Sequence, residues 1–287
     1  MKILICIDDT DNLESIGTGH LLENMCFELK RIGLAKAGFV TRHQLLIHED
    51  IEYTSHNSSM CCEAETEDAE ATTEFAKAYI ASSAAEGSDP GICVLKLREG
   101  DDYEKLMEFG HRAQTEVLKK AEAYAVAEQY PDILSLTEHG GTGDGVIGAL
   151  AGVGLRLTGS DGRIKGKIRP KSENEVLTIK EFCERYHVEQ VVTEDGEKLG
   201  DGEIMHFTEA TKAVLMDHKV TLVALKGEGF WIPKPHKGHK KLMSGQKERE
   251  VSFSCPAEKL PLRLKKPQMN ADTLPMIMRK SASQQKI

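Results

Sequence analysis

The chain has 287 residues, of which 29% are charged and 5% are aromatic, a balance typical of a soluble α/β protein. No apolar run reaches the length of a transmembrane helix, and the first residues enter a predicted strand instead of a signal peptide. The seven cysteines are an odd number without CxxC spacing, which excludes a regular zinc knuckle and favours reduced thiols. We therefore expect a cytoplasmic protein without membrane contact.

The net charge of −9 is unevenly distributed along the chain. Residues 231–287 hold 13 Lys and Arg against 4 Asp and Glu, about +9, so the first 230 residues hold 24 against 42, about −18. A basic tail behind an acidic body indicates either contact with a polyanion such as RNA or a solvated, flexible end. Both interpretations stay open.

Hydrophobic periodicity predicts alternating strands and helices over the first 130 residues. The apolar run Ile3–Ile7 indicates a first strand, 2–7, that is buried on both faces. Further strands are expected at 37–47, 60–65 and 92–97, and helices at 18–33, 66–86 and 102–128. The order β-α-β-β-α-β-α predicts an α/β (α+β) fold with a mixed sheet, helices against it and a ferredoxin-like β-α-β-β-α-β element.

The sequence changes character after residue 165. Short apolar segments, a short helix over Ile179–Tyr186 and Gly-rich turns predict a smaller, β-containing α+β lobe over 166–230. Lysine, proline and polar residues then dominate, so 231–287 is expected to be a basic, flexible tail. The residues expected to bind nucleotide and metal lie in the first part of the chain, 1–165.

Three carboxylates follow the first strand within four positions, Asp8, Asp9 and Asp11, with Thr10 among them. Their mutual repulsion is costly unless a cation lies between them, and hard oxygen ligands suit Mg²⁺. Asp residues at a strand end are also ordinary turn and capping residues, which is the competing interpretation.

A predicted helix begins close behind this turn, at Gly17-Thr18-Gly19. The amides of a helix N-terminus bind anions, and glycines let a ligand approach the backbone closely. Metal ligands on one side and phosphate-binding amides on the other together predict a site for a nucleoside triphosphate, with ATP and Mg as cofactors.

A second glycine-rich stretch, His139–Gly145, precedes a run of small and apolar residues, 146–154. Its glycines, Gly143 and Gly145 among them, are typical of a loop whose amides wrap an anion and lead into a closely packed helix. The pattern is not a P-loop, because no Gly-Lys-Ser/Thr follows, and it meets the Rossmann pattern only loosely.

These stretches resemble the archaeal isoleucine-tRNA agmatinylcytidine synthetase family over about residues 1–160. The residues that match, in order, are Ile7-Asp8-Asp9-Thr10-Asp11, Thr18, Arg42 with the loop from Tyr53 to Ser59, Asp89-Pro90-Gly91, and Gly143-Asp144-Gly145-Val146-Ile147-Gly148-Ala149-Leu150-Ala151. The loop here is Thr54-Ser55-His56-Asn57-Ser58-Ser59, whereas the family's is basic and glycine-rich. No cysteine pairs mark the family's zinc ribbon, and its oligonucleotide-binding barrel is not evident.

The resemblance implies binding of ATP and Mg²⁺ through Asp8, Asp9 and Asp11, and phosphorylation of Thr18. It further implies activation of the C2 oxygen of a tRNA anticodon cytidine, and a small amine, agmatine, then displaces that oxygen. We therefore expect an ATP- and Mg-dependent phosphotransferase or ligase-like enzyme whose partners are a nucleotide and either an RNA or a small amine acceptor. Further residues considered for acid–base work or substrate contact are His20, Arg42, His43, His56, Asn57 and His139.

Two alternatives stay open. The spacing Asp9-Thr10-Asp11 after a strand is also that of a haloacid-dehalogenase-type phosphatase, although Leu13 stands where Thr or Val is usual. The other alternative is a nucleotide- or RNA-binding protein without turnover, in which Phe230, Trp231 and the basic tail contact RNA.

Overall fold

The computed structural model describes residues 1–53 and 56–235, and it confirms the predicted mixed α/β fold. Its first four strands pair in the order β4-β1-β3-β2, and each is antiparallel to its neighbours. The strands are β1 (Lys2–Asp8), β2 (Ala35–Gln44), β3 (Ser58–Thr66) and β4 (Gly91–Lys96). With helices α1 (Thr18–Arg31) and α2 (Ala69–Ser83) between them, this is the predicted ferredoxin-like element.

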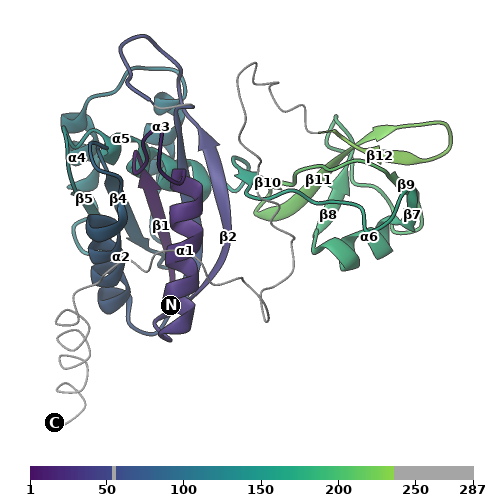
Figure 1. Ribbon diagram of the computed structural model, residues 1–287, viewed down its shortest axis with the longest axis horizontal. Coiled ribbons are helices and arrows are strands. Elements are labelled where there is room, and N and C mark those ends of the chain that lie inside the picture. Colours follow the sequence, from purple (N-terminus) through teal and green to yellow (C-terminus); the bar gives the residue numbers. More distant parts are fainter. Residues whose placement is uncertain (54–55, 236–287) are drawn as a thin grey trace.

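Helices cover both faces of this sheet, so β1 is buried along most of its length (Figure 1). Ile3, Ile5 and Ile7 point to α1 and α2, while Leu4 and Cys6 point to the opposite layer. That layer contains α3 (Glu104–Ala113), α4 (Lys120–Ala127) and α5 (Gly145–Leu157). Residues alternate between two cores along one strand, which explains the uninterrupted apolar run of the sequence.

The helix predicted over 102–128 is two helices, and that expectation was wrong in its middle. The chain leaves the helix after Ala113 and re-enters it at Lys120, while Leu118 is buried in the core between them. Arg112 bridges the gap, because it donates to Glu116 at 2.9 Å and to Glu122 at 2.8 Å. Helical periodicity continues through the break, so the sequence did not reveal it.

Strand β5 (Leu134–Glu138) was not expected as an element, because its apolar signal is weak. It pairs with β4 in antiparallel register, with Gly91 opposite Glu138. This edge strand leads directly into the glycine-rich loop and α5, and so fixes where that loop lies.

The predicted smaller lobe contains a helix at the predicted bounds, α6 (Ile179–Tyr186), begun by a capping box between Thr178 and Glu181. Its core includes the rings of Phe182, Tyr186 and Phe207, which pack at 4.9–5.3 Å between centroids. The strands are β6 (Arg163–Ile164), β7 (Glu175–Thr178), β8 (Gln190–Val192), β9 (Ile204–Phe207), β10 (Val214–Met216), β11 (Lys219–Lys226) and β12 (Trp231–Pro233).

Strand β6 connects the two parts, because it pairs with β2 on one side and with β10 on the other (Figure 1). The sheet continues from β10 through β11, β12 and β9 to β7. At the start of the predicted tail, Trp231–Pro233 pair with β11, whereas the rest of that prediction, from 236 on, lies outside the described residues. Within the described ranges, no helix is long and apolar enough to cross a membrane.

Candidate active site

The turn after β1 has a strained backbone. Asp9 has a φ of 50°, in the left-handed region that non-glycine residues seldom adopt. Asp is among the few residues that tolerate it, at a cost of about 1–3 kcal/mol. The following residue, Thr10, is buried, and its carbonyl accepts a hydrogen bond of 3.0 Å from the amide of Ala85. The surrounding structure therefore holds the turn in a conformation that the chain alone does not favour.

Three side chains from the turn and the helix form a chain of hydrogen bonds. The Thr18 hydroxyl donates to Asp11 Oδ1 at 2.7 Å and accepts from the Thr10 hydroxyl at 3.1 Å. Both threonines are buried. Each group in this chain is therefore oriented by its neighbour, and the oxygen of Thr18 is presented next to a carboxylate.

The N-terminus of α1, beside this series of hydrogen bonds, has no side-chain cap. Gly17 is the N-cap residue, and the first turn contains no acidic side chain. In the described part of the chain, the backbone amides of Thr18 and Gly19 make no hydrogen bond. Two donors and the positive end of the helix dipole therefore remain available to an anion.

The carboxylates at the end of β1 lie among other acids. Burial, together with the charges of Asp9 and Asp11, raises the pKa of Asp8 to about 8. Burial also raises the pKa of Asp9 to about 6, together with the charges of Asp89, Asp11, Glu52 and Asp144. The charged groups that act on these two carboxyls are all negative, so ionisation of both requires a cation nearby.

The glycine-rich loop lies next to this turn, as the two motifs predicted. A Cβ at Gly148, in the first turn of α5, would overlap Asp8 Oδ2, so the carboxyl of Asp8 lies against that helix. Gly145 is packed equally closely on Gly91 of β4. Only residues without a side chain allow α5 to approach the ends of β1 and β4 this closely.

The loop's amides are used within the protein, contrary to the expected cradle for an anion. The amide of Thr142 donates to Asp89 Oδ1, and that of Gly145 donates to the Asp89 carbonyl at 3.1 Å. The amide of Gly143 donates to the carbonyl of Gly140 at 3.1 Å. The loop thus folds around Asp89 and brings Asp89 and Asp144 to the acidic turn, a role that the sequence did not indicate.

The donor set at this turn suits Mg²⁺ by its chemistry. Within residues 1–53 and 56–235, no three His, Cys, Asp or Glu side chains are grouped so as to hold a metal ion by themselves. Mg²⁺ usually binds through one or two carboxylates, with phosphate oxygens and water completing its six ligands. An oxygen-only set whose pKa values are raised first by burial and then by neighbouring acids fits such an ion.

His20 and Arg42 lie on the α1 side of the sheet. Burial lowers the pKa of His20, and the charge of Lys165 lowers it further. Lys165 forms an ion pair of 3.0 Å with Glu23 of α1. Arg42 is half-buried on β2 and donates to Ser58 Oγ at 3.0 Å.

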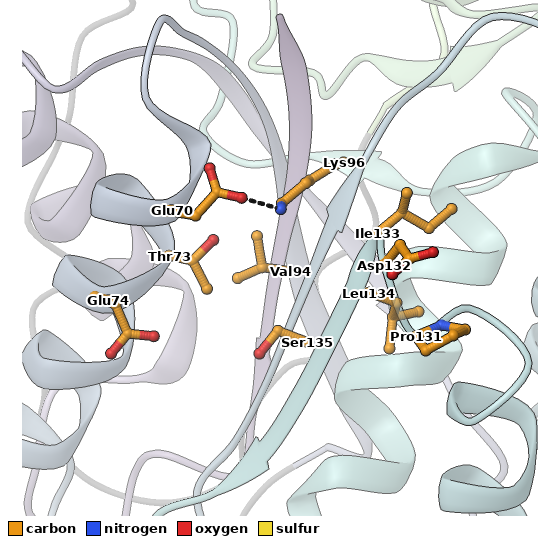
Figure 2. A pocket seen from close by; sticks show the side chains of 10 residues that line it. All are labelled: Glu70, Thr73, Glu74, Val94, Lys96, Pro131, Asp132, Ile133, Leu134 and Ser135. Carbon is orange, nitrogen blue, oxygen red and sulfur yellow. Dashed lines mark hydrogen bonds and ion pairs between the residues drawn. The ribbon is translucent and has the colours of Figure 1, made fainter. Parts of the chain in front are cut away.

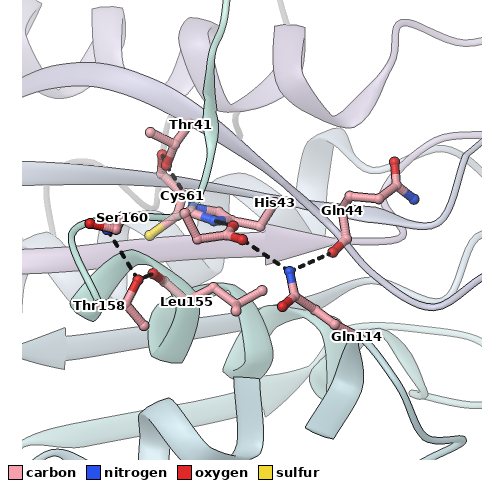
Figure 3. Close-up of polar contacts among 9 residues, drawn as sticks. Thr41, His43, Gln44, Cys61, Gln114, Leu155, Thr158 and Ser160 are labelled. Atoms are coloured by element: carbon pink, nitrogen blue, oxygen red, sulfur yellow. Dashed lines mark hydrogen bonds and ion pairs between the residues drawn. The ribbon is translucent and has the colours of Figure 1, made fainter. Parts of the chain in front are cut away.

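His43 lies on the other face of the sheet and does not join the turn. Its ring is fully buried. Its Nε2 is 2.7 Å from Thr41 Oγ1, a contact that can be followed in Figure 3, and its Nδ1 is 2.7 Å from Asp161 Oδ1. Gln114 donates to the other oxygen of Asp161 at 3.0 Å. Burial lowers the pKa of His43 although Asp161 opposes this. The network ties β2 to the segment after α5.

The other predicted residues lie in two loops: Asn57 and His56 in the β2–β3 loop, and His139 at the start of the glycine-rich loop. Asn57 holds the β2–β3 loop, because its Nδ2 donates to the Leu46 carbonyl at 2.6 Å. His56 is exposed in the same loop. His139 bonds to Thr137 Oγ1 at 2.9 Å, and burial lowers its pKa.

A hollow on the protein surface is separate from this site. It has a volume of about 330 Å³ and lies between α2 and strands β4 and β5 (Figure 2). Its polar lining includes Glu74, Asp132 and the ion pair between Glu70 and Lys96. The acidic turn after β1 contributes nothing to it.

The fold and the site define an α/β protein with a ferredoxin-like sheet and an acidic turn where its first strand meets two helix N-termini. Among solved structures, similar chains are those of the tRNA agmatidine synthetase TiaS, the family whose motifs the sequence resembles. A complex of TiaS with an isoleucine tRNA and ATP is 28% identical, with a TM-score of 0.46, over 54% of this chain and 36% of that chain.

Apo TiaS is 25% identical over 66% of this chain and 41% of that one, with a TM-score of 0.46. A tRNA fluorescent labeling enzyme is 26% identical over 66% and 45%, also with a TM-score of 0.46. The chain thus spans less than half the length of these proteins and is similar to this family over part of its own length. No protein-family model and no curated protein matches the chain.

Proposed function

We propose that this protein is an ATP- and Mg²⁺-dependent phosphotransferase or ligase-like enzyme, with its active site at the turn after β1. The observation that carries this proposal is the 2.7 Å hydrogen bond from the Thr18 hydroxyl to Asp11, set among carboxyls whose charged neighbours are all negative. Phosphoryl transfer depends mainly on positioning and on neutralisation of charge. This turn would supply the positioning through Thr18 and Asp11, and a metal ion held by its carboxylates would supply the neutralisation.

Asp8, Asp9 and Asp11 would hold the metal ion. When bound, Mg²⁺ would supply the positive charge that neutralises the phosphates. The amides of Thr18 and Gly19 would donate to phosphate oxygens, since no group of the described chain occupies them.

Thr18 is the phosphoryl acceptor in this proposal, as the motif resemblance implies. Asp11 Oδ1 accepts the hydroxyl hydrogen, so it orients the Thr18 oxygen and takes its proton as that oxygen bonds to the terminal phosphorus of ATP. The bond from that phosphorus to the bridging oxygen breaks, and ADP leaves. Thr10 donates to the Thr18 oxygen and limits its rotation.

The second acceptor follows from the motif resemblance alone. An RNA and a small amine are the two candidates, and the chain would act on them in the cytoplasm. Neither the described lobe over 166–230 nor the acidic turn identifies which one is used.

The experiment is incubation of the full chain with Mg²⁺ and radiolabelled ATP, followed by mapping of the label. We expect label on Thr18 in the wild type and in Asp101→Asn, an exposed carboxylate distant in sequence. Thr18→Val and Asp11→Asn should remove it. Label on Asp9 in place of Thr18 would reject this mechanism in favour of the phosphatase type.

A further inference from the structure

One row of residues crosses the sheet at the level of the acidic turn. The strand register pairs Ile92 with Ile7, Ile7 with Met60, Met60 with Arg42, and Arg42 with Arg163. The three apolar members pack in or against the core under α1 and α2. The row ends in two arginines, on β2 and β6, next to the part of the sheet that the helices cover.

The two arginines face each other across neighbouring strands, where like charges are destabilising. Burial lowers the pKa of Arg42, and the charge of Arg163 lowers it further. Among residues 1–53 and 56–235, the side chain of Arg42 donates to neutral groups only, Ser58 Oγ at 3.0 Å and Gln44 Oε1 at 3.3 Å. In the described part of the chain, neither arginine forms an ion pair with a carboxylate.

Three other arginines of the described residues are neutralised locally. Arg31 pairs with Glu28 at 2.6 Å, Arg112 pairs with two glutamates, and Arg185 pairs with Glu175. The buried Arg156 instead lies over the ring of Phe39. Arg42 differs from these four because a second arginine faces it across the neighbouring strand. The missing negative charge is what a bound anion supplies, and guanidinium groups match phosphate oxygens in geometry.

This pair lies close to the candidate active site. Arg42 and Ile7, the residue before Asp8, are two strands apart, which corresponds to about 10 Å. Lys165, which follows β6 two residues after Arg163, passes over the first turn of α1. Its Cε would lie 2.7 Å from a Cβ at Gly19. The ammonium group of Lys165 is paired with Glu23, so this lysine places the segment after β6 against the N-terminus of α1 without adding free positive charge there.

We propose that Arg42 and Arg163 form a phosphate-binding site beside the acidic turn. The phosphate can come from two sources: the polyphosphate of the nucleotide, which would reach across α1, or a phosphodiester of an RNA acceptor. The choice of a nucleotide or an RNA as the source of the phosphate rests on the proposed function. The anion site itself depends only on the arginine pair.

Three full-length variants test the site: Arg42→Gln, Arg163→Gln and the control Lys36→Gln. Lys36 is exposed on the same strand, β2, and opposes Glu65, far from the pair. Thermal unfolding is measured with pyrophosphate and with chloride at equal ionic strength. Pyrophosphate should raise the midpoint of the wild type and of Lys36→Gln, because a ligand of the folded state stabilises it. Arg42→Gln and Arg163→Gln should lose this rise while keeping a wild-type midpoint in chloride.

Direct binding of Mg·ATP and of a labelled single-stranded RNA then distinguishes the sources. Each arginine variant should weaken binding of the true source about tenfold, the loss expected for one charge-assisted contact. An unchanged pyrophosphate shift in both variants, with unchanged ATP and RNA binding, would overturn the site. If the wild type binds no ATP but the pyrophosphate shift still needs the arginines, the phosphate site stands and the proposed ATP chemistry fails.

Discussion

The carboxyl group of Asp8 lies directly against the Cα of Gly148, so that any side chain at 148 would overlap it. This contact joins the end of β1 to the first turn of α5, two segments that are far apart in the sequence. It also buries the carboxyl among other acids and raises its pKa to about 8. The close approach of the helix therefore sets both the position and the charge of a candidate metal ligand.

Gly148→Ala should disturb the turn from a distance. The new methyl group must displace Asp8 or α5, and overpacking of this kind costs about 1–3 kcal/mol of unfolding free energy. We expect a lower denaturation midpoint and weaker Mg·ATP binding. Gly202→Ala is the matched control, because no atom lies within 4 Å of a Cβ there. Equal stability and nucleotide affinity in the two variants would contradict the contact.

Asp8→Asn should stabilise the protein in the absence of Mg²⁺ while removing a metal ligand. The pKa of Asp8 rises from 3.8 to about 8 on folding, so between these pH values the folded state binds more protons than the unfolded state. Unfolding free energy therefore falls as pH rises through this window. At pH 8 the variant should be more stable than the wild type by several kcal/mol, because each pKa unit of the shift corresponds to about 1.4 kcal/mol.

Chemical denaturation from pH 5 to pH 8 measures this difference, with Asp101→Asn as the control for loss of an exposed carboxylate. The gap between Asp8→Asn and the wild type should widen as pH rises. A variant less stable than the wild type at pH 8 would show that the carboxyl is satisfied without a cation.

His43 should act on stability and not on nucleotide binding. Folding lowers the pKa of its buried ring below 6.5, so the unfolded state binds the extra proton and stability is lost as pH falls through that region. His43→Gln should lower unfolding free energy at pH 7.5 by about 1–3 kcal/mol, because buried hydrogen bonds to Thr41 and Asp161 are disrupted.

The pH dependence of unfolding near 6 should also flatten in His43→Gln, while the affinity of the folded variant for Mg·ATP stays at the wild-type value. Calorimetric titration at a temperature where the variant is folded gives that affinity. A large loss of affinity would place His43 in the active site after all.

Much of the fold was predictable because local periodicity and burial agree. The run Ile3–Ile7, the helix from Thr18 and the capped helix Ile179–Tyr186 all follow from spacing within one segment. The break in the helix between Ala113 and Lys120 was not predictable, because it depends on where Leu118 packs and on the ion pairs of Arg112.

The site divides in the same way. Asp8 to Asp11 and the glycines at 143–148 are each adjacent in the sequence, so both motifs can be recognised from the sequence alone. Packing of α5 against the end of β1 brings the two motifs together. The amide of Thr142 donates to Asp89 because β4 pairs with β5. Sequence spacing does not reveal this pairing. Arg163 faces Arg42 through strand register between segments distant in sequence, beyond the reach of any local pattern.

Calorimetric titration of Mg·ATP into the wild type and into Asp9→Asn tests the central claim most directly. Asp9 is the strained residue of the turn, and the charges that raise its pKa come from four other acids, so its loss should remove the metal-dependent affinity. We expect saturable binding by the wild type and at least a roughly tenfold weaker affinity in Asp9→Asn, the effect of one charge-assisted contact. Equal affinity in the two proteins would contradict a metal–nucleotide site at the end of β1.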